Sequence, residues 1–363
     1  MAYIPCCAHN IQLVVKDGLK LSKDYNSLID RVSKDIVSKS KMSHCIAEEL
    51  RIMNKRLNTK NLTRWNSILF MIRSVLKMSP EEMRQIRNKM PTLTADQKNA
   101  KKNFDLSDVE REMLAELMIL LEHFEWVTDE LQSNEISISR VYPCVLALKQ
   151  RLSDIERIYE FTTKIRKDLL ESLDKRFSKL IEQDLFIVST FLDPHFGNDQ
   201  FDEDKIKIVK SRIVSLVKQQ NTIDMVKETI NVNETSEKNK KSPLITKNEK
   251  KRSQNYLSYK CKSNNTSSGS RLIEDEINKY IRTLNDSNFE FEGTLSFWKN
   301  NESRFINLSK LAKKYLGVQA SSAAVERMFS IAGHIFQAKR RRMGFNLFSL
   351  LVFIKLNEKF LKL

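Results

Sequence analysis

Cysteine and histidine residues near the start of the sequence have spacings that could bind a metal. Two residues separate Cys6 from His9, which is half of a zinc-ligand pattern. The adjacent pair His44 and Cys45 could in principle provide the other two ligands. Adjacent side chains suit a tetrahedral site poorly, however, and the second pair lacks the usual spacing. We therefore predict no metal site.

Two carboxylates are candidate catalytic groups. Asp193 precedes Pro194 at the end of an apolar run, where an aspartate is more often a turn former. Glu326 lies beside Arg327 on a predicted helix, where a solvated ion pair is the usual arrangement. No glycine-rich phosphate loop, Ser-His-Asp arrangement or Cys-His nucleophile pair stands out.

The elements that must position these side chains are helices. Apolar residues recur at helical rather than alternating spacing, and only seven glycines and six prolines occur, so we predict a mostly α fold. Ser107 and Glu110 stand in the register of a capping box. Predicted helices cover residues 11–21, 28–57, 63–79, 107–131, 141–161, 165–180, 273–284, 308–316, 323–332 and 347–356.

The length of 363 residues favours more than one domain. The segment Leu185–Pro194 is predicted to end a domain, because Pro194 stops regular structure. Residues 221–270 are rich in Asn, Ser, Thr and Lys, and ten Lys and Arg oppose five Asp and Glu there. We predict that they form a disordered basic linker between a domain at 1–220 and another at 271–363.

Charge indicates the class of partner. Lys and Arg number 62 against 46 Asp and Glu, a net charge of +16, so nucleic acid is the first candidate partner. Surface charge typical of a lysine-rich proteome would give the same excess. The basic run Lys339, Arg340, Arg341 and Arg342 could contact phosphates or direct nuclear import, while the simplest interpretation is a charged helix start.

Cysteine usage and hydropathy exclude two other classes. The five cysteines are odd in number and irregularly spaced, which argues against a disulfide framework and for a reducing compartment. Even the apolar stretch from Leu350 to Ile354 is far shorter than the ~20 residues that a bilayer requires. We therefore expect no membrane partner.

The predicted helix at 347–356 is apolar on nearly every side. Such a helix must be buried by its own domain and by a partner, since the few neighbouring helices cannot cover all of its faces. We predict a homodimer whose interface includes Leu347, Phe348, Leu351, Phe353 and Ile354.

Several motifs carry a family resemblance. Leu311-Ala312-x-x-Tyr315-Leu316, the string from Ala320 to Ser330, Gly333, the arginines and the leucine-rich tail resemble the hAT C-terminal dimerisation region. Cys6-x-x-His9, Thr63-Arg64-Trp65-Asn66-Ser67 and Phe191-Leu192-Asp193-Pro194 agree with the family upstream, in the same order. The chain thus resembles the carboxy-terminal part of a hAT (hobo/Activator) transposase or a domesticated descendant, and is similar to BED-type zinc-finger transposase-derived proteins.

The resemblance implies an RNase H-like fold interrupted by a large all-α insertion, usually preceded by a BED-type zinc finger. Residues 1–220 would be the helical insertion region, and 271–363 the dimerisation region with the last helices of the RNase H-like fold. The β-sheet and the first two catalytic aspartates should lie upstream of Cys6. We therefore expect the sheet to be largely missing and this chain not to cut DNA.

The resemblance also implies site roles. Glu326 matches the family's catalytic glutamate, and Cys6 and His9 would shape the region near the active site. The ring of Trp65, beside Arg64, could stack on an unpaired base, or it could instead be buried in the insertion core. Together with the basic run at 339–342, these two residues are the candidate DNA contacts.

The expected function is that of a nuclear, transposase-derived protein that dimerises and binds DNA weakly, without activity or cofactor as given. The alternative is that this sequence is part of an active cut-and-paste transposase. In that case a two-metal site, with Mg²⁺ or Mn²⁺, would be completed by upstream aspartates.

Overall fold

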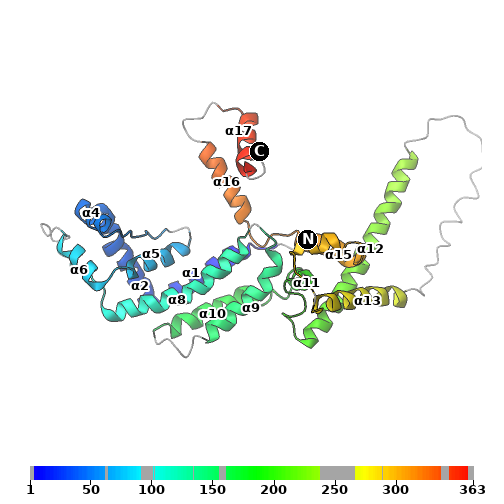
Figure 1. The fold of residues 1–363 in the computed structure, drawn as a ribbon, viewed down its shortest axis with the longest axis horizontal. Helices are drawn as coiled ribbons and strands as arrows, with labels where there is room; N and C mark the ends of the chain where they lie inside the picture. Colours follow the sequence, from blue (N-terminus) through cyan, green and yellow to red (C-terminus); the bar gives the residue numbers. More distant parts are fainter. Residues whose placement is uncertain are drawn as a thin grey trace, which may run out of the picture. The chain divides into compact units, whose positions relative to one another are not determined.

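The computed structural model describes residues 4–61, 64–90, 101, 103–133, 135–154, 161–237, 266–287, 289–336 and 343–358. Its regular elements within these ranges are all helical, which confirms the predicted mostly α fold (Figure 1). None of the described helices is long and apolar enough to cross a membrane.

The described chain divides into two compact units. Unit 1 comprises Met1–Gln183 together with Gln319–Leu363, and unit 2 comprises Asp184–Val318. These boundaries differ from the divisions predicted near residues 220 and 270. The segment Leu185–Pro194, which was expected to end a domain, lies at the start of unit 2.

Unit 1 contains eleven α-helices, one π-helical segment and one 3₁₀ turn in its described part. They are α1 (Cys7–Leu21), α2 (Lys23–Arg31), the π-helical η1 (Val32–Ser38), α3 (Lys39–Met42), α4 (His44–Ile52), α5 (Asn66–Leu76), α6 (Pro80–Asn88), α8 (Asp108–Leu131), the 3₁₀ turn η2 (Ile138–Arg140), α9 (Val141–Asp154), α10 (Thr163–Phe177), α16 (Ala323–Ile335) and α17 (Phe345–Leu356). Helix α1 is central, because it packs against both α10 and α8.

The predicted amphipathic face of α1 is the one that is buried. Ile11, Val14 and Val15 are fully enclosed, and Leu19 nearly so, at the helical spacing seen in the sequence. Gly18 lies where α10 crosses, and a Cβ at this position would be 2.6 Å from Cδ2 of Leu169. The absence of a side chain at Gly18 therefore permits the close approach of α1 and α10.

Helix starts are explained by local hydrogen bonds. The predicted capping box of α8 is confirmed: the Glu110 N–H donates to Ser107 Oγ, and the Ser107 N–H donates to the Glu110 carboxylate. A second box, Ser79 with Glu82, starts α6 and is followed by Pro80 in the first helical position. Both boxes satisfy amide groups that the first turn leaves without helical acceptors.

Two helix predictions were wrong in detail. The single helix expected over 28–57 is instead α2, η1, α3 and α4, because Ser43 adopts an extended backbone (φ −99°, ψ 118°) and interrupts the run. Gly333 was expected to end a helix, but α16 continues through it to Ile335.

Unit 2 is built from α11 (Asp184–Leu192), α12 (Glu203–Glu237), α13 (Thr266–Leu284), α14 (Thr294–Asn300) and α15 (Ile306–Leu316). Its core is aromatic. Tyr280 is fully buried and stacks on Trp298 with ring centroids 5.4 Å apart. The Tyr280 hydroxyl donates to the carbonyl of Phe191, and Trp298 Nε1 donates to that of Leu192.

Both ends of the segment predicted to be a linker contain helix. Helix α12 runs on to Glu237, and helix α13 begins at Thr266, so both ends of the 221–270 segment are helical. Residues 238–265 lie outside the described residues. Linker composition therefore did not prevent helix formation at the edges of the segment.

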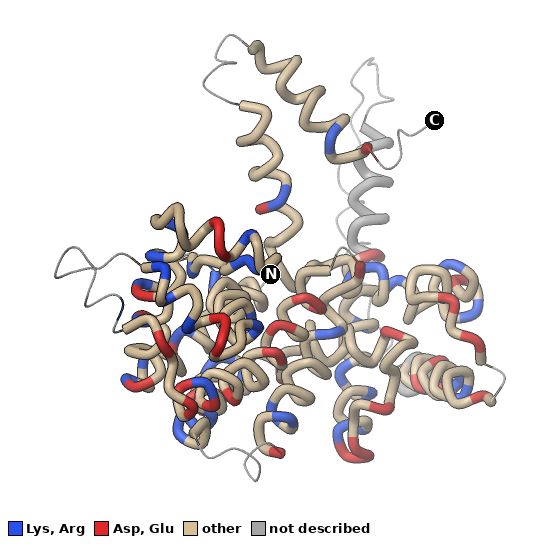
Figure 2. Tube along the Cα trace, turned by 60° about the vertical axis from the view of Figure 1, so that its left-hand side comes forward, with Lys and Arg blue, Asp and Glu red and all other residues tan. Residues whose placement is uncertain are grey.

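Helices α16 and α17 pack against each other. Phe336 and Phe348 meet edge to face, with ring centroids 5.8 Å apart. Figure 2 shows these two helices almost without charged residues, in contrast to the rest of the chain, where Lys, Arg, Asp and Glu are interspersed. We call this pair the α16–α17 hairpin.

Candidate nucleic-acid pocket and dimerisation surface

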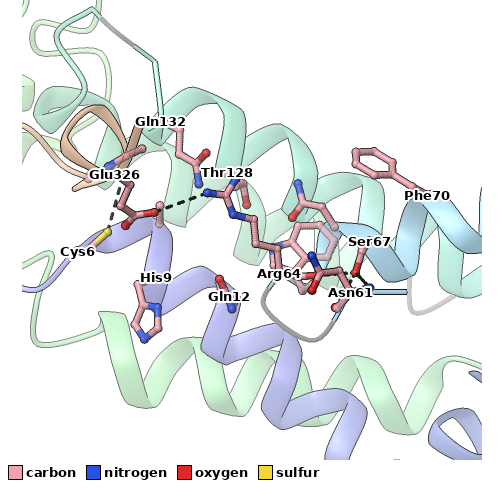
Figure 3. Close-up of a pocket in the computed structure, with 15 residues that line it drawn as sticks. Cys6, His9, Gln12, Asn61, Arg64, Ser67, Phe70, Thr128, Gln132 and Glu326 are labelled. Carbon is pink, nitrogen blue, oxygen red and sulfur yellow. Dashed lines mark hydrogen bonds and ion pairs between the residues drawn. The ribbon is translucent and has the colours of Figure 1, made fainter. Parts of the chain in front are cut away.

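A pocket of about 600 Å³ in unit 1 collects several of the residues singled out in the sequence. Four parts of the chain form it: the start of α1, the start of α5 with the loop leading into it, the end of α8 and the start of α16 (Figure 3). We call it the Glu326 pocket. Its lining comprises Cys6, Ala8, His9, Gln12, Asn61, Arg64, Trp65, Asn66, Ser67, Phe70, Thr128, Gln132, Ser321, Ala323 and Glu326.

Backbone hydrogen bonds bring the start of α16 to the pocket. The Cys7 N–H donates to the carbonyl of Ala320 over 2.8 Å, although the two residues are more than 300 positions apart. The Ala320 N–H in turn donates to Ser137 Oγ over 3.0 Å. Ser137 is buried and also hydrogen-bonded to the side chain of Gln319. The segment before α16 is therefore anchored on both sides.

Cys6 lies at the centre of this anchor. Its sulfur accepts a hydrogen bond from the Ser322 N–H over 3.4 Å, and it also lies 3.4 Å from the Ser322 hydroxyl, whose single hydrogen it shares with Glu326. Burial alone would raise the pKa of the Cys6 thiol, but these bonds and others stabilise the thiolate and bring the pKa below its usual value. The neighbouring Cys7 is buried, and desolvation raises its thiol pKa to about 12.

Glu326 is held in the first turn of α16. The Ser322 hydroxyl donates to Glu326 Oε1 over 2.7 Å, and Arg64 Nη2 lies 3.7 Å from Oε2 (Figure 3). Both charged side chains stay accessible, with 68% of Arg64 and 57% of Glu326 exposed. Glu326 thus forms a solvent-exposed ion pair with Arg64, and Arg327 donates to the Gln132 carbonyl.

The lining does not fit a two-metal site by itself. Such a site uses several carboxylates to hold two cations. Glu326 is the single carboxylate among the described residues that line this pocket, and it already accepts from Ser322. Across the described residues, no group of three or more His, Cys, Asp and Glu side chains is placed to bind a metal. We therefore derive no metal-dependent step from these residues.

Arg64 and Trp65 have different surroundings. The Ser67 hydroxyl, which donates to the Arg64 carbonyl and also meets the backbone of Asn61, shapes the loop that carries Arg64 into the pocket. Trp65 is only 5% exposed, and its ring meets Phe124 edge to face. Trp65 is thus a core residue, which is the arrangement given above as the alternative to base stacking. Base stacking by Trp65 stays a prediction.

Phe70 was missed by the sequence analysis. It projects from α5 into the same pocket and is 43% exposed (Figure 3). Within the sequence it stands next to buried positions of an apolar run, so nothing in the periodicity distinguishes it. Phe70 is the exposed aromatic side chain among the described residues of the lining.

Other predicted site residues are placed as follows. His9 is exposed and lines the pocket with Cys6, whereas His44 and Cys45 lie on α4 and are not among the lining residues. Asp193, in unit 2, is buried, and its side chain accepts hydrogen bonds from the His195 N–H and the Thr294 hydroxyl. The bond to His195, two residues further on, is typical of an aspartate that forms a turn. The basic run Lys339–Arg342 lies outside the described residues.

The predicted interface residues of α17 are largely accessible in the single chain. Leu347, Phe353 and Ile354 are exposed, while Phe348 and Leu351 are half-buried. No residue of α17 is fully buried. Helix α16 adds the exposed apolar side chains Val325 and Phe329, and Phe336 directly follows the helix. The hairpin therefore presents an apolar surface that the described part of its own chain leaves uncovered.

Comparisons with known proteins agree with these features. Residues 276–358 match the hAT family C-terminal dimerisation region, and residues 4–117 match the ZBED1 RNase-like helical domain. The chain is 21% identical to the Homo sapiens protein "Zinc finger BED domain-containing protein 4" over 371 residues, covering 98% of this chain and 29% of that protein. It is 21% identical to the Zea mays protein "Putative AC transposase" over 368 residues, covering 97% and 44%. The chain thus spans less than half the length of these two relatives.

Proposed function

Because the chain belongs to the hAT transposase superfamily, we propose that it is a transposase-derived protein that forms a homodimer through the α16–α17 hairpin and binds DNA in the nucleus. The observation that carries the proposal is the uncovered apolar surface of the hairpin. It lies within the region that matches the dimerisation family.

A second copy of the chain is the partner that suits this surface. A specific interface removes about 800 Å² per partner from water and has an apolar centre enriched in aromatic residues. The hairpin exposes Phe329, Phe336, Phe345 and Phe353 along with leucines, and few charges interrupt them. An isolated hairpin with this composition would otherwise be an aggregation-prone patch.

The test compares charged substitutions inside and outside the hairpin. Leu350 is 54% exposed on α17, and Leu295 is 72% exposed on α14, so Leu350→Asp and Leu295→Asp make the same chemical change at accessible sites. We expect light scattering of the full chain at tens of micromolar to give a dimer mass for the wild type and Leu295→Asp. Leu350→Asp and Phe353→Asp should give a monomer, because each buries an unpaired charge in the dimer. A folded monomeric wild type, or dimers indifferent to both hairpin substitutions, would refute the proposal.

DNA binding is supported by the +16 net charge and by the position of Arg64 at the mouth of the Glu326 pocket. In this proposal the Glu326 pocket lies on the DNA-binding side of the protein. Phosphates would compete with Glu326 for the Arg64 guanidinium, since the ion pair at 3.7 Å is exposed to solvent.

A second candidate function is that of an active cut-and-paste transposase, in which Glu326 supplies one carboxylate of a two-metal site. The position of Glu326 in a pocket that also contains Arg64 favours this second function. The assay is strand nicking of DNA with Mg²⁺ or Mn²⁺. Nicking that disappears in Glu326→Gln would establish this function over the first, and its absence from the wild-type chain would favour the first.

A further inference from the structure

A second hollow of about 270 Å³ adjoins the Glu326 pocket. We call it the lysine hollow. Four residues, Gln12, Asn61, Arg64 and Trp65, line both. The lysine hollow is completed by Lys16, Leu19, Lys20, Asn26, Ile29, Lys60 and Ile68.

The rim of the lysine hollow is cationic. Lys16 and Lys20 are both exposed and stand four residues apart on α1, so they share one helix face. Lys60 and Arg64 approach from the loop before α5. No acidic residue is among the described residues that line the hollow. Asp30, just outside it, pairs with Lys60 Nζ at 2.8 Å and partly neutralises that lysine.

The floor of the lysine hollow is apolar. Leu19, Ile29 and Trp65 are almost completely buried and present only small edges to it, and Ile68 is half-buried. An apolar floor beneath a cationic rim matches an unpaired nucleic acid strand, which has accessible bases as well as phosphates. A duplex would present mainly phosphates, because its bases are stacked and paired within the helix.

One face of α1 connects the two hollows. His9, Gln12, Lys16 and Lys20 follow one another at spacings of three or four residues and so form a polar stripe along the helix. His9 and Gln12 line the Glu326 pocket, and Gln12, Lys16 and Lys20 line the lysine hollow. The stripe therefore offers a continuous polar and cationic path from one hollow to the other.

We propose that the lysine hollow is a binding site for an unpaired DNA strand, whose phosphates lie on Lys16, Lys20 and Lys60 and which continues past Gln12 and Arg64 into the Glu326 pocket. The inference rests on the proposed DNA-binding function and adds to it the form of the DNA and the residues that bind it. Charge complementarity and the wall shared with the Glu326 pocket support this occupant.

The experiment measures binding of the full chain to a labelled single-stranded oligonucleotide and to the matching duplex by fluorescence anisotropy, over a range of salt concentrations. The test variant is K16E/K20E. The control is K34E/K41E, which makes the same charge change at two exposed lysines of unit 1 outside both hollows. Light scattering and circular dichroism establish that both variants remain folded.

We expect K16E/K20E to raise the Kd for the single strand about tenfold over the control. It should also reduce the slope of log K against log salt by about 1.4, which corresponds to two lost single-strand phosphate contacts. The effect on the duplex should be smaller. Asp30→Asn should have the opposite effect and strengthen single-strand binding, because it releases Lys60 from its ion pair.

Three results would overturn the inference. They are equal weakening by K16E/K20E and K34E/K41E, a larger effect on the duplex than on the single strand, and no gain in Asp30→Asn. If the wild-type chain bound no DNA in either form, the proposed function itself would fail and the inference with it. DNA binding that is unaffected by the lysine substitutions would overturn the inference and leave the proposed DNA-binding function standing.

Discussion

At the scale of single residues, a small hydrogen-bond network around Ser322 joins distant parts of the sequence. The Ser322 N–H donates to the Cys6 sulfur, and the Ser322 hydroxyl lies within hydrogen-bonding distance of both that sulfur and Glu326 Oε1. Ser322 therefore fixes both a thiol at the start of α1 and the carboxylate in the pocket. Arg64 completes the group from the loop before α5.

Replacing Ser322 should change the reactivity of the Cys6 thiol. The hydrogen bonds from Ser322 lower the Cys6 pKa, so Ser322→Ala removes one donor and should raise that pKa. The pH midpoint of Cys6 alkylation by iodoacetamide, followed by mass spectrometry, should then move to higher pH. Cys7 and Cys144, whose pKa values are raised to about 12 by burial, should be alkylated slowly throughout.

The exposed Cys45 serves as the internal control for this measurement. Its alkylation profile should be the same in the wild type and in Ser322→Ala, since Cys45 lies on α4 and is not among the residues that line the Glu326 pocket. An unchanged Cys6 midpoint, or a shift to lower pH, would contradict the role assigned to Ser322.

At the scale of helices, the contact between α1 and α10 organises unit 1. Asp17 of α1 accepts hydrogen bonds from Ser172 and Arg176 of α10, over 2.8 and 2.7 Å. Although burial alone would raise it, these interactions lower the Asp17 pKa. Gly18, the next residue of α1, lies against Leu169 of α10. Polar and apolar contacts therefore fix the same crossing.

Gly18→Ala should destabilise the protein even though alanine is the better helix former. Helix propensity alone would favour alanine by about 1 kcal/mol. The added Cβ would lie 2.6 and 2.8 Å from two side-chain carbons of Leu169, and overpacking of this kind typically costs about 1–3 kcal/mol. We expect a net loss of stability, measured as a lower midpoint of thermal unfolding.

Gly333→Ala is the matched control for the helix crossing. Gly333 also lies inside a helix, α16, but a Cβ there would meet no atom within 4 Å. This variant should be as stable as the wild type or slightly more stable. A Gly18→Ala protein that unfolds at or above the wild-type temperature would show that α10 can move aside without cost.

At the scale of the whole molecule, charge and apolar surface are separated. The excess of 16 positive charges is spread over the chain, whereas the α16–α17 hairpin, which exposes several aromatic residues, contains few charged residues (Figure 2). Dimerisation would thus use one surface and leave the basic residues available for DNA. A dimer would also double the charge that acts on a single DNA molecule.

DNA binding by the whole chain should weaken steeply with salt and depend little on base sequence, because phosphate contacts by lysine and arginine release counterions. We expect a linear fall of log K with log salt and equal competition by unrelated DNAs of the same length and form. Filter binding or anisotropy at several salt concentrations provides the measurement. A strong preference for one sequence that survives high salt would contradict this expectation.

Local patterns of sequence determined the helices. The apolar face of α1 and the Ser107–Glu110 capping box were both predictable, since they depend on residues within one or two turns of each other. The motifs around Arg64 and Glu326 also indicated the superfamily. The break at Ser43 was not predictable, because the lysine-rich run around it has helical periodicity throughout.

Only the tertiary structure decided which motif residues lie together. Ala320 bonds to Cys7 across more than 300 residues, and this contact places Ser322 and Glu326 beside Cys6 and Arg64. The tertiary structure also decided that Trp65 is almost completely buried while Phe70, which lines the same pocket, is exposed. Helical periodicity specifies which face is buried, but not which distant segment covers it, because that depends on packing between elements far apart in the chain.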